Sequence, residues 1–327
     1  MKFSHIYIEK EIIQLERTQR ILNSLRESTI VEIDNYKNIF NRSNQNFQSQ
    51  KQKPKLILAK KKDQFYYIGS PLTKSSEIQN FYYNNTIMNC VYNCEYCYLQ
   101  GMYNSSHIVV FVNLEDFFSE TEKLLEEKKS ILLCISYDTD MLAIEKYSGF
   151  IKEWILFAKN FPNLQLEIRT KSNKFNEIED LEPSPNVLLA WTLSPESVVK
   201  DLEHKTPTLN RRIDSMQKAI DRGWNVRICF DPILFVEDYK TKYSEMLKTV
   251  FSKIRSEKIF DFTVGVFRIS KDYLKNIKKM RTDSKLIYFP YTLNENTFTY
   301  PENLESEMKD FFLTELKQYV TSEKVWV

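Results

Sequence analysis

Three cysteines stand close together in the segment NCVYNCEYCYLQ, which covers residues 89–100. Cys90, Cys94 and Cys97 form a C-x3-C-x2-C array, and three thiolates on one loop can ligate three irons of a cubane [4Fe-4S] cluster. Such a set leaves the fourth iron without a protein ligand, and chemistry at a cluster requires an open metal position. The array therefore predicts a catalytic iron–sulfur site.

Zinc binding and unrelated packed cysteines are the alternative interpretations of this array. A closed structural zinc site normally has four ligands, and His107, the nearest histidine in sequence, lacks a ligand spacing to the cysteines. The aromatic residue before the last cysteine, Tyr96, and the strand expected just before the array both favour a cluster. Clustered cysteines of this kind are typical of a reducing compartment rather than of a secreted disulfide framework.

The elements that must position the array alternate along the chain after residue 80. Short apolar runs predict strands at 83–89, 130–137, 164–170, 187–193, 225–230 and 262–268. Helical patterns lie at 113–128, 142–160, 208–222, 240–256 and 303–320, and a less regular one lies at 172–181. This alternation is typical of βαβ units, and we expect an α/β fold in which about six parallel strands bend into a partial barrel.

The chain divides into three expected parts. Residues 1–80 predict a small amino-terminal subdomain with a polar loop at 41–52, residues 81–270 predict the barrel, and residues 271–327 predict a basic, aromatic and then helical segment. No apolar run approaches the roughly 18 residues that span a bilayer, and the amino terminus is charged where a signal peptide is apolar. We therefore expect a cytoplasmic protein without membrane contact.

Composition narrows the function only a little. The formal net charge of +2 excludes neither nucleic acid nor a small substrate. The chain holds only five glycines and no glycine-rich phosphate loop, which argues against a P-loop or dinucleotide-binding fold.

With these residues in view, the chain resembles the spore photoproduct lyase family of radical S-adenosylmethionine (SAM) enzymes, as a divergent member. CEYCYLQ is close to the family's C-x-Y-C-Y-L-Q. Further similar segments are VFVNLEDFF at 110–118, RTK at 169–171, WTLS at 191–194, TPTLNRR at 206–212, DPI at 231–233 and VFR at 266–268. The resemblance implies a TIM-like partial (β/α)6 barrel of the radical SAM type, with ligands at the carboxyl ends of its strands.

The resemblance also implies an activity. A [4Fe-4S] cluster would bind and cleave SAM to give a 5′-deoxyadenosyl radical. The most direct expectation is lyase-type repair of a thymine-dimer lesion in DNA by carbon–carbon bond cleavage, with an electron donor such as flavodoxin or ferredoxin. Two alternatives remain: the same radical chemistry on a peptide or small molecule, and a non-catalytic iron–sulfur or zinc protein that binds nucleic acid.

Carried over by position, Lys171 and Ser194 match family residues that contact SAM, and Asp231 occupies a third such position where the family usually has alanine. Lys171 would pair with the SAM carboxylate and Ser194 would hydrogen-bond it. We also place Tyr96 and Thr139 in the cofactor site. The residues alone equally allow a surface lysine and a helix-capping serine.

The hydrogen-atom donor is where the chain departs from the family pattern C-T-S-D. Aligning the last residue of that pattern on Asp140 puts Tyr137 where the donor cysteine belongs. Cys134 lies an odd number of residues earlier, so regular strand alternation points it to the opposite face as a buried apolar residue. Tyr137 is then either the donor or a stacking wall, Cys229 is a deeper and poorer candidate, and Tyr98 matches a tyrosine that relays hydrogen atoms in the family.

The carboxy-terminal third departs further, because the family's basic, glycine-containing DNA-binding segment has no clear counterpart. Residues 286–300 are aromatic and contain no arginine, although they allow stacking on bases. A basic stretch at 268–285 precedes them and is either a solvated helix face or a phosphate-tracking surface.

Strand alternation predicts a polar barrel interior. If Lys171, Ser194 and Asp231 face inward, so do five further side chains, which are Glu167, Arg169, Thr192, Arg227 and Cys229. Buried charges need partners, and we therefore expect a Glu167–Arg227 or a Glu167–Arg169 pair deep in the barrel.

Overall fold

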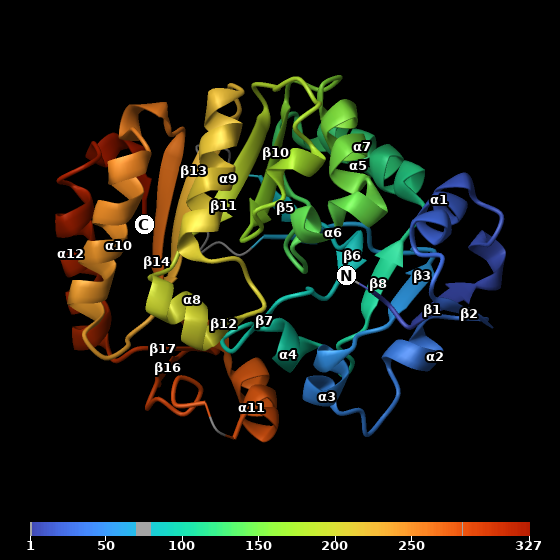
Figure 1. Cartoon of the computed structure of the whole chain (residues 1–327), viewed down its shortest axis with the longest axis horizontal. Coiled ribbons are helices and arrows are strands. Elements are labelled where there is room, and N and C mark those ends of the chain that lie inside the picture. Colours follow the sequence, from blue (N-terminus) through green and yellow to red (C-terminus); the bar gives the residue numbers. More distant parts are fainter. Residues whose placement is uncertain (1, 70–79, 283) are drawn as a thin grey trace.

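The computed structural model describes residues 2–69, 80–282 and 284–327, and its largest element is a curved sheet (Figure 1). The strands of this sheet are β4 (Tyr67–Ile68), β5 (Phe81–Tyr83), β9 (Ile131–Cys134), β10 (Leu164–Thr170), β11 (Val187–Thr192), β13 (Asn225–Ile233), β14 (Asp261–Val266) and β18 (Val325–Trp326). Their order is β18-β14-β13-β11-β10-β9-β5-β4, and the run from β5 to β14 is parallel throughout. This confirms the predicted six-stranded partial barrel.

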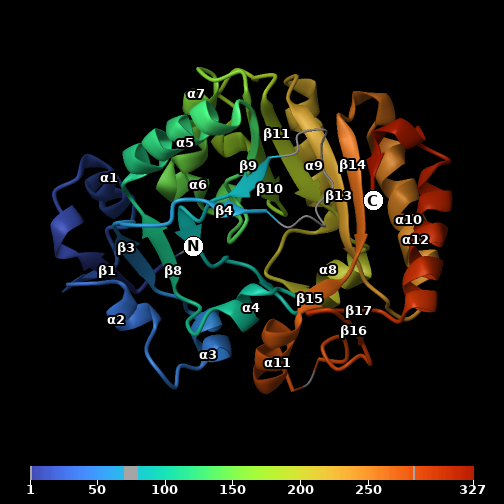
Figure 2. The ribbon, with the colours of Figure 1, turned by 180° about the vertical axis from the view of Figure 1, so that it is seen from behind.

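Helices cover the outer face of the curved sheet (Figures 1 and 2). They are α5 (Leu114–Lys128), α6 (Met141–Ser148), α7 (Phe150–Ala158), α9 (Leu209–Asp221), α10 (Tyr239–Lys253) and α12 (Glu302–Leu316). Helix α8 (Glu196–Leu202) lies instead at the carboxyl end of β11 (Figure 1). A parallel strand must return over one face before the next begins, and the helix that makes the return buries the apolar residues of that face. The main core therefore lies between sheet and helices, and the inner face is left for polar residues.

A second sheet joins the amino-terminal segment to the rest of the chain. Its strands are β1 (His5–Glu9), β2 (Thr29–Ile33), β3 (Leu56–Ala59), β6 (Ile87–Met88) and β8 (Ile108–Phe111), in the order β2-β1-β3-β8-β6. Three helices accompany it, α1 (Glu16–Ser24), α2 (Lys37–Phe40) and α3 (Phe47–Gln52). The sheet thus takes strands from both sides of the expected boundary at residue 80, and the division into three units stays a prediction.

Three of the predicted elements take a different form in the structure. The expected strand 83–89 becomes β5 and β6, which belong to different sheets. The expected helix 142–160 breaks at Gly149, whose φ of +68° ends α6 in the left-handed conformation that glycine adopts without strain. Residues 172–181 form only a single 3-10 turn, Phe175–Glu177.

The cysteine loop, residues 89–100, crosses between the two sheets. It contains β7 (Asn93–Cys94), which pairs with β12 (Glu203–His204), and it leads into α4 (Leu99–Met102). Figures 1 and 2 show α4 between α3 and α11 (Lys271–Met280). A small sheet of β15 (Arg268–Ser270), β17 (Thr297–Thr299) and β16 (Thr292–Asn294) adjoins α11.

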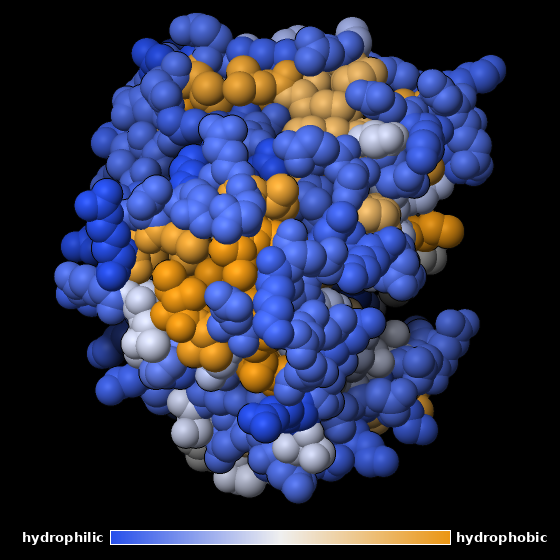
Figure 3. All heavy atoms as spheres, turned by 90° about the vertical axis from the view of Figure 1, so that its right-hand side faces the viewer, coloured by the Kyte–Doolittle hydropathy of each residue, from blue (hydrophilic) through white to orange (hydrophobic). Residues whose placement is uncertain are grey.

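The surface on the side of the second sheet carries both hydrophilic and hydrophobic residues (Figure 3). Figure 3 views this side and shows a largely hydrophilic surface in which hydrophobic residues gather in patches. On the edge strand β2, Ile30 is exposed. None of the helices in the described residues combines the length and the apolar character that a membrane span needs.

Candidate active site

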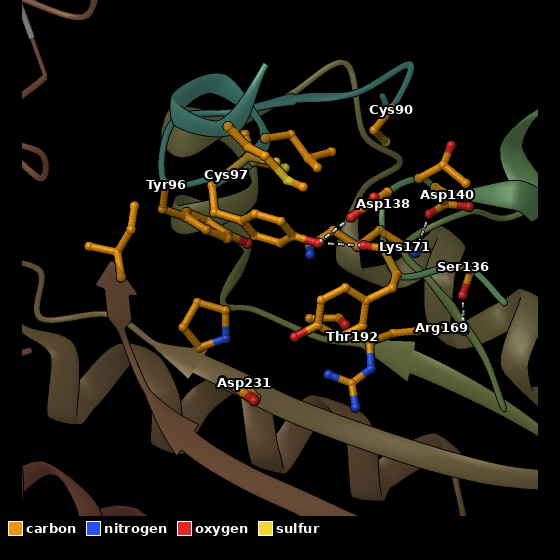
Figure 4. A pocket seen from close by; sticks show the side chains of 18 of the residues that line it. Cys90, Tyr96, Cys97, Ser136, Asp138, Asp140, Arg169, Lys171, Thr192 and Asp231 are labelled. Carbon is orange, nitrogen blue, oxygen red and sulfur yellow. Dashed lines mark hydrogen bonds between the residues drawn. The ribbon is translucent and has the colours of Figure 1, made fainter. Parts of the chain in front are cut away.

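A cavity of about 540 Å³ lies at the carboxyl ends of the barrel strands, beside the cysteine loop (Figure 4). Ligands of parallel α/β folds bind at this end, where loops and strand termini bring polar groups together. The lining includes Cys90, Cys97, Tyr137, Lys171, Thr192 and Asp231. One cavity thus collects side chains from the cysteine loop and from four barrel strands or the turns after them.

The three cysteine thiols all line this cavity. Burial raises the pKa of Cys90 to about 11, with the nearby Asp140 carboxylate adding to the effect, and burial also raises the pKa values of Cys94 and Cys97. Each thiol lies near enough to the others that ionisation of one hinders ionisation of the next. The thiols will therefore ionise together only with a cationic partner such as a metal cluster.

The chemistry of this donor set fits a cluster. Within the described ranges, no three Cys, His, Asp or Glu side chains are arranged to hold a single metal ion. A cubane does not need that arrangement, because its three thiolates bind three different irons.

A carboxamide fixes the shape of the cysteine loop from inside. The Gln100 Nε2 group donates to three main-chain carbonyls within residues 94–97, at 2.8, 3.2 and 3.3 Å. Its Oε1 atom accepts from Arg281 Nε and from Gln48 Nε2, both at 2.6 Å, and Arg281 also donates to the Asn93 Oδ1 atom at 2.6 Å. No sequence pattern indicated these roles for Gln100 and Arg281, although CEYCYLQ includes the glutamine.

Lys171 stands where β10 ends, and a buried carboxylate positions it. Its backbone N–H donates to Asp140 Oδ2 at 2.6 Å, and its ammonium lies 5.6 Å from the centroid of the Tyr96 ring. Burial opposes the charged form, but Glu203 and Cys94 outweigh it, so the pKa of Lys171 lies above its ordinary value. Lys171 therefore places a positive charge in the cavity (Figure 4).

Two further predicted cofactor residues line the same cavity. Thr139 is buried, and in the described part of the chain its Oγ1 atom has no hydrogen-bond partner. Such an orphaned hydroxyl costs stability unless a ligand satisfies it. The ring of Tyr96 also lines the cavity, while its hydroxyl donates to the Glu203 carboxylate. A hydroxyl without a partner among the described residues and an ammonium that line one cavity suit a ligand with a carboxylate.

Ser194 lies apart from this set. It is buried, its hydroxyl donates to Glu203 Oε1 at 3.0 Å, and it is not among the residues that line the cavity. The same carboxylate accepts from Arg212 Nη2 at 2.5 Å. Glu203 thus joins Ser194, Tyr96 and Arg212 into one buried group behind the cavity. Ser194 and Tyr96 were predicted to belong to the site and Arg212 lies within the TPTLNRR segment, but no sequence pattern indicated Glu203.

Asp231 lines the cavity but already has a cationic partner. Its carboxylate oxygens lie 3.1 and 3.2 Å from the guanidinium of Arg268. Two members of the basic stretch therefore face inward, because Arg281 holds the cysteine loop and Arg268 pairs with Asp231.

The barrel interior contains the predicted ion pairs. Glu167 lies 2.5 Å from Arg227 and 3.2 Å from Arg169, so both expected pairs are confirmed, and Arg227 also pairs with Asp261 at 2.5 Å. Burial opposes ionisation of Glu167, but the two arginines outweigh it and lower its pKa. Among these, Glu167 and Arg169 line the cavity.

The structure brings Tyr98 and Tyr137 together, as the hypothesis of a hydrogen-atom relay requires. The Tyr98 hydroxyl donates to the Tyr137 carbonyl oxygen at 2.8 Å and to Asp138 Oδ1 at 3.0 Å. Tyr103 donates to Asp138 Oδ2 at 2.7 Å, and burial raises the pKa of this carboxylate. The Tyr137 ring stacks on Tyr83, with centroids 4.2 Å apart.

The predicted orientation of Cys134 is wrong. Cys134 pairs in register with Glu167, whose side chain lines the cavity, and register partners in a parallel sheet face the same side. Strand β9 ends at Cys134 and the chain then turns, so strand alternation does not extend to Tyr137. Cys134 is nevertheless buried, as predicted, and lies behind Ser136, 3.9 Å from its hydroxyl oxygen. Neither Cys134 nor the buried Cys229 lines the cavity.

Comparison with known proteins gives one consistent result. The family model described as spore photoproduct lyase matches residues 2–325. A spore photoproduct lyase of Clostridium acetobutylicum is 23% identical over 243 residues, which cover 71% of this chain and 72% of the relative. A Bacillus subtilis protein of the same name is 22% identical over 202 residues, 60% of this chain and 59% of the relative.

Solved structures agree in fold. A spore photoproduct lyase variant superposes with a TM-score of 0.86 at 16% identity, over 99% of this chain and 98% of that one. A second variant, with bound AdoMet and dinucleoside spore photoproduct, gives a TM-score of 0.84 at 16% identity over the same shares of the two chains. The family model confirms the family resemblance, and the solved structures confirm the barrel that the sequence predicted.

Proposed function

Since the chain belongs to the spore photoproduct lyase family, we propose that it is a radical SAM enzyme that repairs a thymine-dimer lesion in DNA. The observation that carries the proposal is the shared cavity. Three cysteine thiols from one loop, the Lys171 ammonium and the orphaned Thr139 hydroxyl all line it, at the end of the barrel where ligands bind.

Different residues would bind the cluster and SAM. Cys90, Cys94 and Cys97 would hold the [4Fe-4S] cluster, and Lys171 with Thr139 would bind the amino acid part of SAM. When bound, the cluster and SAM supply a 5′-deoxyadenosyl radical, which removes a hydrogen atom from the lesion. The electron that this needs would come from a small donor such as flavodoxin or ferredoxin.

In this proposal, two tyrosines return a hydrogen atom to the substrate radical and so complete the catalytic cycle. Loss of a hydrogen atom lets the carbon–carbon bond between the two thymines break, and one thymine is left as a radical. Tyr137, which lines the cavity, gives that radical the hydrogen atom of its phenol and becomes a tyrosyl radical. Tyr98, whose ring centroid lies 6.0 Å from that of Tyr137, relays a hydrogen atom from 5′-deoxyadenosine to restore Tyr137.

The cavity also suits a nucleobase substrate. Tyr83, Tyr137 and Tyr273 present aromatic rings on which bases stack. These rings partly replace the basic DNA-binding segment that the carboxy-terminal third lacks.

The first experiment tests the cluster. Anaerobically reconstituted protein should bind about four irons and, with dithionite and SAM, produce 5′-deoxyadenosine. Alanine at Cys90, Cys94 or Cys97 should abolish both results, whereas the matched control Cys134→Ala, a buried cysteine outside the cavity lining, should retain them. SAM cleavage at the wild-type rate by any of the three loop variants would disprove the ligand assignment.

A further inference from the structure

Lys51 is a buried lysine whose charge has no carboxylate partner among the residues that the structure describes. It lies on α3, its side chain reaches the cysteine loop, and only 4% of the residue is exposed. Its ammonium donates to the Cys90 carbonyl oxygen and lies 5.7 Å from the centroid of the Phe47 ring. In the described part of the chain, no Asp or Glu oxygen lies within 4.0 Å of it.

Two fully buried arginines of this chain are compensated by carboxylates. Arg212 pairs with Glu203 and Arg227 pairs with both Glu167 and Asp261, at 2.5 Å in each case. A buried charge without a counter-charge is strongly unfavourable, because the protein interior does not replace the water that solvated it. We therefore expect a negatively charged group beside the Lys51 ammonium.

The cysteine loop can supply that negative charge. The Lys51 ammonium donates to the carbonyl oxygen of Cys90, and Cys90, Cys94 and Cys97 line one cavity. The Lys51 ammonium thus lies beside the loop that carries the three predicted cluster ligands.

We propose that Lys51 is the cationic partner of the iron–sulfur cluster, and that it holds the cluster in place and raises its reduction potential. The inference rests on the proposed function, because it needs the cluster. The oxidised core carries two positive charges and its three thiolates carry three negative ones, so the ligated cluster is an anion. Reduction adds a further negative charge, which a fixed ammonium at short range stabilises.

Contacts of the Lys51 main chain and of Gln48 hold α3 against its neighbours. Lys205 Nζ donates to the Lys51 carbonyl oxygen at 2.6 Å, and Gln48, one turn earlier on α3, donates to Gln100 at 2.6 Å. The amino-terminal segment thereby contributes a charge to a site whose ligands all lie beyond residue 89.

The first test measures the reduction potential of the reconstituted cluster in a dithionite titration followed by electron paramagnetic resonance. Lys51→Met should shift the potential to a more negative value, and Lys51→Arg, which keeps the charge, should shift it less. Lys61→Met is the matched control, because Lys61 is 8% exposed and contacts Asn85 and Tyr67 rather than the cysteine loop. Equal potentials for wild type and Lys51→Met would overturn the proposal.

The second test separates this role from a purely structural one. In the cluster-free protein, Lys51→Met removes an uncompensated buried charge, so its urea midpoint should be higher than that of the wild type. In the reconstituted protein the same variant should release its iron faster to a chelator. A structural lysine predicts a lower midpoint in the cluster-free protein, and that result would refute our proposal.

These outcomes are distinguishable from failure of the proposed function. If the wild type assembles no cluster, the function itself is wrong and the partner role falls with it. If both proteins assemble about four irons and lose them to the chelator at the same rate, only the role of Lys51 is wrong.

Discussion

At the scale of single residues, some charges of the candidate site are paired with an opposite charge, whereas other polar groups are placed to bind a ligand. Asp231 is neutralised by Arg268, and Glu167 is held by two arginines. Lys171 and Thr139 line the same cavity, and in the described residues no hydrogen bond of the Lys171 ammonium or the Thr139 hydroxyl is formed. We therefore expect the Lys171 ammonium and the Thr139 hydroxyl to supply most of the binding energy for a carboxylate ligand.

The Lys171→Met variant tests this at the residue scale. Removal of one side of a charge-assisted contact should weaken SAM binding by about 1.5–3 kcal/mol, or roughly ten- to a hundredfold. The dissociation constant is measured on cluster-loaded protein, with Lys174→Met, an exposed lysine outside the cavity lining, as the control. An unchanged constant in Lys171→Met with full iron content would show that the residue is misassigned.

At the scale of elements, local patterns predicted the strands and helices of the barrel well. The strand 164–170 is found at those residues, and α5, α9 and α10 lie within two or three residues of their expected ranges. Periodicity did not predict which sheet a strand would join, because pairing depends on residues far apart in sequence. The expected barrel strand 83–89 therefore splits: β5 joins the barrel, and β6 pairs with β8 in the second sheet.

Strand alternation predicted the site residues that lie on or just after regular strands. It failed where a strand is shorter than the apolar run that predicted it. Lys171, Thr192 and Asp231 line the cavity as strand alternation requires. The orientation of Cys134 was mispredicted because β9 is shorter than the apolar run 130–137. Glu203 was missed because its partners come from separate loops and helices that no local pattern connects.

The end of β9 leads to an element-scale prediction about the hydrogen-atom donor. Tyr137 lines the cavity, whereas Cys134 faces the barrel interior but lies behind Ser136. Tyr137→Phe should thus slow turnover or divert the thymine radical to side products, and Cys134→Ala should leave the products unchanged. Product analysis by mass spectrometry checks both variants. Aberrant adducts from Cys134→Ala, with normal products from Tyr137→Phe, would make the cysteine the donor.

At the scale of the whole molecule, the cysteine loop is held from both ends of the chain. Gln48 and Lys51 approach it from the amino-terminal segment, and Arg281 and Ser284 approach it from the carboxy-terminal one, where Ser284 donates to Glu95 at 2.5 Å. Figures 1 and 2 show the corresponding helices α3 and α11 on the two sides of α4. The cluster site is therefore a product of the complete fold and not of the cysteine motif alone.

The measurement that tests the central claim most directly follows deuterium from the lesion. Reconstituted protein, dithionite and SAM are incubated with a dinucleoside spore photoproduct. In this substrate, deuterium replaces the carbon-bound hydrogens of the two thymines. We predict that intact thymines are released and that deuterium appears in 5′-deoxyadenosine or in SAM. If the protein cleaves SAM while the lesion stays intact and no label is transferred, the substrate is not a thymine dimer, and a peptide or small molecule takes its place.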